Sequence, residues 1–72
     1  MNLPQAKQYC KEHNDLNPGY IWVNDDKELF WSNERPTRYD GFWGCNSRTF
    51  IQLYLGKFTG NDNWQETLRE IM

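Results

Sequence analysis

The sequence contains no long hydrophobic run, and this absence narrows the class of protein at once. A membrane-spanning helix needs about 18 or more consecutive apolar residues, and no stretch of this chain approaches that length. A basic start followed by an apolar stretch, typical of a signal peptide, is also missing. With 72 residues, the chain is expected to form a single domain, residues 1–72, with no membrane partner.

Cysteine is scarce, which bears on the cellular compartment. Small secreted domains of this size are commonly held together by four or more cysteines, whereas this chain has only Cys10 and Cys45. It also has no Asn-x-Ser/Thr glycosylation site. We therefore expect free thiols and a cytoplasmic protein, with a single Cys10–Cys45 disulfide as the alternative.

An excess of basic charge is missing as well. Ten acidic and eight basic residues give a formal net charge of −2. A domain whose affinity rests on phosphate contacts usually carries a basic surplus, so the composition disfavours nucleic acid as the partner.

No pattern of catalytic or metal-binding residues is present. The one histidine, His13, has no nucleophile and orienting acid at a recognisable spacing. Cys10 and His13 lie three residues apart, and with Cys45 they are still one ligand short of a structural zinc site. The segment 56–60 contains a Gly-Lys pair, but Phe58 directly follows the lysine, where a phosphate-binding loop needs a serine or threonine hydroxyl. The sequence predicts no enzyme, no metal and no cofactor.

Aromatic residues, in contrast, are abundant, with four each of Trp, Tyr and Phe. So small a chain buries enough apolar surface to fold only if most of these rings lie in its core. Rings left at the surface would reduce the buried apolar area, which contact with a second copy of the chain could restore. We therefore expect a monomer or a homodimer.

The N-terminal segment predicts a helix over residues 3–14. Asn2 and Gln5 have the spacing of a reciprocal capping box, and Pro4 fits the first turn, where a missing N–H costs little. Pro18-Gly19 is a strong helix breaker beyond it.

Residues 20–32 predict a β-hairpin, because two runs of β-forming residues flank the polar residues 24–27. A two- or four-residue loop centred on Asp25-Asp26 would pair Val23 with Glu28. One face of the hairpin would then carry Tyr20, Trp22, Leu29 and Trp31. A three-residue loop would shift the register by one residue and mix these sets.

The C-terminal half predicts one further strand and a second helix. Residues 49–55 favour a strand by composition, although the spacing of Arg48, Gln52 and Gly56 also fits a short helix. A short strand around 42–45 is a further option. A helix is expected to open at Asp62 and to place its apolar residues on one stripe. These are Trp64, Leu68, Ile71 and Met72.

The predicted fold class is therefore α+β. A small antiparallel sheet of three to four strands, with the hairpin 20–32 at its centre, would be packed by an N-terminal and a C-terminal helix.

Residues 33–48 form the segment most suggestive of function, because aromatic residues and arginines alternate in an irregular stretch. Trp, Tyr and Arg are enriched at protein-interface hot spots, and aromatic rings also stack on single-stranded nucleic acids. The candidate binding residues are Trp31, Arg35, Arg38, Tyr39, Trp43 and Arg48. The competing interpretation is that the tryptophans are simply core.

The expected function is that of a small non-enzymatic module that binds another protein, as an inhibitor or adaptor of a larger host protein. Accessory proteins of phages and mobile elements are often of this size. The alternative is a single-stranded nucleic-acid-binding protein that uses the aromatic and arginine residues of 35–48.

Overall fold

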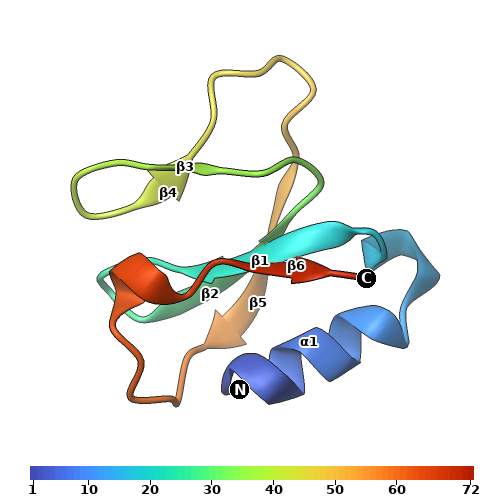
Figure 1. Ribbon diagram of the computed structural model, residues 1–72, viewed down its shortest axis with the longest axis horizontal. Helices are drawn as coiled ribbons and strands as arrows, with labels where there is room; N and C mark the ends of the chain where they lie inside the picture. Colours follow the sequence, from blue (N-terminus) through green and yellow to red (C-terminus); the bar gives the residue numbers. More distant parts are fainter.

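The computed structural model describes all 72 residues and has three layers (Figure 1). A four-stranded antiparallel sheet in the order β5-β2-β1-β6 lies between a helix and a two-stranded ribbon, β3–β4. The regular elements are α1 (Leu3–Lys11), β1 (Gly19–Val23), β2 (Glu28–Ser32), β3 (Thr37–Arg38), β4 (Trp43–Gly44), β5 (Gln52–Lys57) and β6 (Arg69–Ile71). Two 3₁₀ turns complete the chain, η1 (Asn14–Leu16) and η2 (Trp64–Glu66).

The first helix begins as the sequence predicts. The backbone N–H of Gln5 donates to the Asn2 side chain at 2.9 Å. In return, the backbone N–H of Asn2 donates to the Gln5 side chain, also at 2.9 Å. The helix ends at Lys11 rather than at residue 14, because Asn14 opens the separate turn η1. Leu3, Ala6 and Cys10 form its buried face.

The hairpin is present, but with the register of a three-residue loop. Val23 pairs with Leu29, and the Lys27 N–H donates to the Asn24 carbonyl in the turn. Lys27 adopts a positive φ of 65°, the left-handed position that a three-residue hairpin loop uses. The expected pairing of Val23 with Glu28 is therefore wrong.

This register changes which side chains share a face. Ile21, Val23, Leu29 and Trp31 lie in the main core cluster. Trp22 belongs to the opposite face, where its ring stacks on Phe30 at a centroid distance of 4.9 Å.

The expected C-terminal helix is not formed. Residues 64–66 make a single 3₁₀ turn without a side-chain cap, and Arg69–Ile71 pairs with β1 as strand β6. Strand β6 pairs the outer edge of β1, which would otherwise have free backbone groups. Just before this strand, the hydroxyl of Thr67 accepts the backbone N–H of Val23 at 2.9 Å. Sheet pairing therefore overrides the helical spacing of the apolar residues in this segment.

The core has two parts, one on each face of the sheet. Ten buried residues from α1, η1, the sheet and the segment around Phe58 make the larger part, beneath the helix. On the other face Trp22 is fully buried, and its indole N–H donates to the hydroxyl of buried Ser32 at 3.0 Å. Trp43 is also buried but lies outside the larger cluster.

Candidate protein-interaction surface

The β3–β4 ribbon is fixed to the rest of the chain by polar anchors around Trp43. The backbone N–H of Trp43 donates to the Asn24 side chain at 2.9 Å, and its indole N–H donates to the Trp64 carbonyl at 3.2 Å. The backbone N–H of Asp25 also donates to the Gly41 carbonyl at 3.3 Å. These bonds hold the ribbon against the β1–β2 turn and η2. In Figure 1 both lie below the ribbon, at the left end of the sheet.

A tight turn at the end of the ribbon brings two aromatic rings together. The N–H of Tyr39 donates to the carbonyl of Phe42 at 2.8 Å, which leaves Asp40 and Gly41 as the two loop residues. Gly41 has a φ of +85°, which glycine adopts without strain at this turn position. The Tyr39 and Phe42 rings stack with a centroid distance of 5.2 Å and an interplanar angle of 21°. Although stacked, Tyr39 stays 37% exposed and Phe42 48% exposed.

A groove of about 530 Å³ lies beside this ring pair. It runs from the ribbon to the beginning of β5. Its lining residues are Asn24, Tyr39, Phe42, Trp43, Gly44, Cys45, Asn46, Phe50 and Gln52. The groove is therefore mainly walled by aromatic rings and amide side chains.

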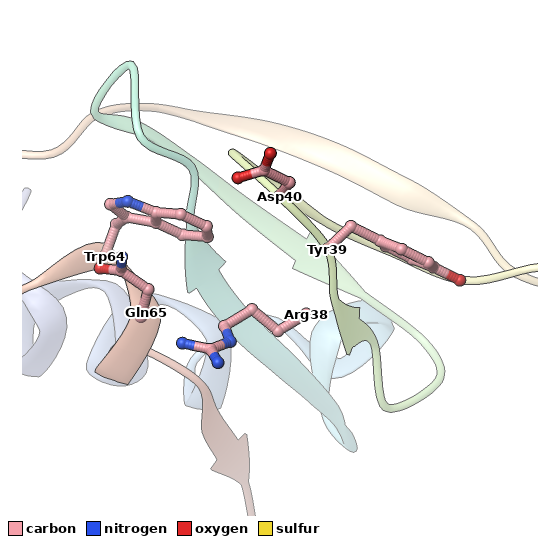
Figure 2. A pocket seen from close by; sticks show the side chains of 5 residues that line it. All are labelled: Arg38, Tyr39, Asp40, Trp64 and Gln65. Atoms are coloured by element: carbon pink, nitrogen blue, oxygen red, sulfur yellow. The ribbon is translucent and has the colours of Figure 1, made fainter.

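A second pocket, of about 370 Å³, lies between the ribbon and η2 (Figure 2). It is lined by Arg38, Tyr39, Asp40, Trp64 and Gln65. Figure 2 shows the Arg38 side chain reaching toward η2 on the side of Gln65, while the Tyr39 ring points away from Trp64. The Gln65 Oε1 atom is buried and has no hydrogen-bond partner. Tyr39 borders both hollows and so links them into one surface.

The segment that follows the ribbon is ordered by the side chains of Glu34 and Asn33. The Glu34 carboxylate accepts hydrogen bonds from the hydroxyl groups of Ser47, at 3.2 Å, and Thr49. The Asn33 amide donates to the Thr49 carbonyl at 2.8 Å and accepts from the Ile51 N–H at 2.7 Å. This segment forms the projection at the top of Figure 1.

The candidate residues divide into exposed and buried groups. Arg35, Arg38, Tyr39 and Arg48 are exposed. No hydrogen bond within the chain holds the three guanidinium groups, whereas that of Arg69 donates to the carbonyls of Glu66 and Leu68.

The two candidate tryptophans are buried instead. Trp31 lies in the core beneath the helix, and its indole N–H donates to the Leu16 carbonyl at 2.8 Å. A Cβ atom on Gly19 would lie only 2.1 Å from that indole nitrogen, so the backbone closes directly over the ring. Trp31 and Trp43 are therefore almost fully buried, although Trp43 contributes to the lining of the groove, whereas the rings of Tyr39 and Phe42 are exposed.

Three further exposed side chains lie outside the six candidate binding residues. Ile51, Leu53 and Tyr54 are all exposed although they lie in or next to β5. Their alternation with polar Gln52 indicates a strand, but only the strand order β5-β2-β1-β6 shows that this strand is an edge.

Cys10, on the buried face of α1, is an ionisable side chain whose pKa depends on its burial. Burial raises the pKa of the Cys10 thiol from 9.0 to about 11, which disfavours its thiolate. Both cysteines are free. No group of three His, Cys, Asp or Glu side chains is arranged to hold a metal ion.

Comparisons of the chain with protein-family models, with curated proteins and with solved structures give no match. None of its helices combines the length and apolar character required to cross a membrane.

Proposed function

We propose that this chain is a small non-enzymatic module that binds another protein in the cytoplasm, through the Tyr39–Phe42 ring pair and the groove beside it. The observation that carries the proposal is that two large rings stay substantially exposed on an anchored ribbon. A role as inhibitor or adaptor of a larger protein, as for accessory proteins of phages and mobile elements, is the form of this activity that we infer. Two unbridged cysteines agree with a reducing compartment.

The energetics of interfaces support this assignment. Tyr and Phe have few rotatable bonds, and stacking and the short turn already restrict the two rings, so binding would cost little additional side-chain entropy. Arg38 lies in the ribbon, and Arg35 and Arg48 flank the ribbon in sequence. Their exposed guanidinium groups supply donors for carboxylates or carbonyl groups of a partner. The amide side chains of Asn24, Asn46 and Gln52 line the groove beside the ring pair. An aromatic centre with polar groups beside it is typical of an interface hot spot.

Single-stranded nucleic acid is the second candidate, because exposed rings and free guanidinium groups are also what such ligands contact. The placement of acidic groups weighs against it. Asp40 lines the same pocket as Arg38, and an Asp25 carboxylate oxygen lies 3.3 Å from the position of a Cβ on Gly41. Carboxylates beside the ribbon would repel a phosphate backbone.

The proposal is tested by quantitative affinity capture from cells in which the chain occurs naturally. The double variant Tyr39→Ser/Phe42→Ser removes both rings but leaves the anchoring bonds of Trp43 in place. We expect it to lose the captured protein by at least about tenfold, since removal of hot-spot aromatics costs about 2 kcal/mol or more.

The matched control is Tyr9→Ser, which removes a comparably exposed ring from α1, on the other face of the sheet. The control is expected to capture the same protein as the unmodified chain. Equal capture by the double variant and the control would refute this surface, and a captured species that disappears on nuclease treatment would favour nucleic acid.

A further inference from the structure

The two edges of the main sheet are protected very differently. The β6 edge is three residues long and carries the charged side chains Arg69 and Glu70. The β5 edge is six residues long and has a single charge, Lys57, at its far end. Short length and charge are the common means by which edge strands avoid pairing with other chains, and β5 has neither along its first half.

The backbone groups of β5 also point outward at known positions. The carbonyl of Ile51 accepts the N–H of Asn33 at 3.2 Å, and its own N–H donates to the Asn33 side chain, so both groups of Ile51 face β2. Peptide groups alternate in direction along a strand. The N–H and C=O groups of Gln52 and Tyr54 therefore face away from the sheet.

Apolar side chains flank these outward backbone groups on both faces. Leu53 pairs with Trp31 and so lies on the helix side of the sheet, together with Ile51 two residues earlier. Tyr54 lies on the ribbon side, where its ring and that of Phe30 make an edge-to-face pair with centroids 5.7 Å apart. Ile51, Leu53 and Tyr54 are 57%, 45% and 53% exposed.

We propose that β5 pairs with β5 of a second copy of this chain, antiparallel and about a two-fold axis at Leu53. In this register Gln52 of each copy lies opposite Tyr54 of the other, so the outward groups of these residues would exchange four hydrogen bonds. Leu53 meets its own counterpart, and Ile51 lies opposite Leu55. The result is a continuous eight-stranded sheet.

The edge is complementary to itself in both charge and face. Residues 51–55 contain no charged side chain, so the two-fold axis brings no like charges together. On the face of the sheet that α1 covers, the apolar residues of one copy lie beside the apolar residues of the other copy. The irregularity in register between Leu29 and Phe30 ends the regular stretch near Leu55, which confines the pairing to this uncharged segment.

The test uses disulfide trapping in a Cys45→Ser background, in which buried Cys10 is the only other thiol. Cα atoms of a directly opposed, non-hydrogen-bonded pair lie about 4.5 Å apart, within the range that a disulfide spans. Leu53→Cys is therefore expected to form a covalent dimer under mild oxidation. Lys57→Cys, on the same strand but not opposite itself in this register, is the matched control and is expected to stay largely monomeric.

Sedimentation of the unmodified chain from about 10 µM to about 1 mM covers the affinities expected of a small interface. We expect dimerisation within this range, and we expect Leu53→Lys to abolish it by placing two lysines opposite each other. Met72→Lys, at another exposed apolar residue, should leave the dimer intact.

A monomer throughout that range, or equal trapping of Leu53→Cys and Lys57→Cys, would overturn the proposal. Either result leaves the proposed function standing, because that function rests on the Tyr39–Phe42 pair and not on β5.

Discussion

Thr67 shows how much of this fold depends on a single hydroxyl group. It is fully buried, accepts the N–H of Val23 at 2.9 Å and donates to the carbonyl of Trp64 at 2.8 Å. Thr67→Val keeps the shape but leaves the Val23 N–H without a partner. We expect the free energy of unfolding, measured in urea, to fall by about 1–3 kcal/mol.

Thr67→Ser is the control, because it keeps the hydroxyl group and removes only a methyl. It should be less destabilised than Thr67→Val. The reverse order would mean that packing of the methyl, rather than the two hydrogen bonds, holds η2 to β1.

Cys10 gives a second prediction at this scale, on reactivity and pH. Its buried thiol, with a pKa of about 11, should react far more slowly with iodoacetamide at pH 8 than the half-buried Cys45. Mass spectrometry should find one rapidly modified thiol per chain, and none after Cys45→Ser. Equal rates at the two cysteines would show that α1 does not cover Cys10.

The same pKa predicts how stability depends on pH. Between pH 9 and pH 11 the folded chain keeps the Cys10 proton that the unfolded chain releases, so the contribution of this thiol to stability declines across that interval. Below pH 9 both states hold the proton, and the contribution is constant. Cys10→Ala should flatten the stability profile above pH 9.

At the scale of elements, the sequence carried enough information for α1 and for the existence of the hairpin. Capping at Asn2 and Gln5 is a local signal, and the structure has it. The register depended on the loop length, which the polar run at 24–27 leaves open because it contains no glycine to mark the left-handed residue. Lys27 takes that position.

The C-terminal segment could not have been assigned from local pattern alone. Trp64, Leu68 and Ile71 have helical spacing, yet Ile71 is buried as part of a strand that pairs with Gly19. That pairing joins residues 52 positions apart, and no window of sequence around Asp62 reports it. A long-range strand partner therefore outweighed the local helical preference.

The ribbon yields a prediction about Trp43. Its ring is buried, and its indole N–H donates to the Trp64 carbonyl. Trp43→Ala should therefore lower the free energy of unfolding by about 3–5 kcal/mol in a denaturant titration. Phe42→Ala, one residue away but exposed, should cost no more than about 1 kcal/mol. Similar small losses for both variants would show that the ribbon does not pack on the sheet.

On the scale of the whole molecule, the sequence analysis anticipated the exposure of some candidate residues but not of others. Arg35, Arg38, Arg48 and Tyr39 are exposed, and whether residues 33–48 bind a partner stays a prediction. The burial of Trp31 and Trp43 could not be read from the sequence, because it depends on which hairpin face meets α1 and on where the ribbon docks. The exposure of β5 likewise follows from strand order.

We propose that the ring pair at residues 39 and 42 contacts a protein partner, and this contact can be tested in the cell. It is tested most directly by placing a photoactivatable benzophenone amino acid at position 42, and in a separate chain at position 9, and irradiating living cells. If the contact exists, position 42 gives a discrete, protease-sensitive and nuclease-resistant adduct and position 9 gives none. The same adduct from both positions, none from position 42, or an adduct removed by nuclease would contradict it.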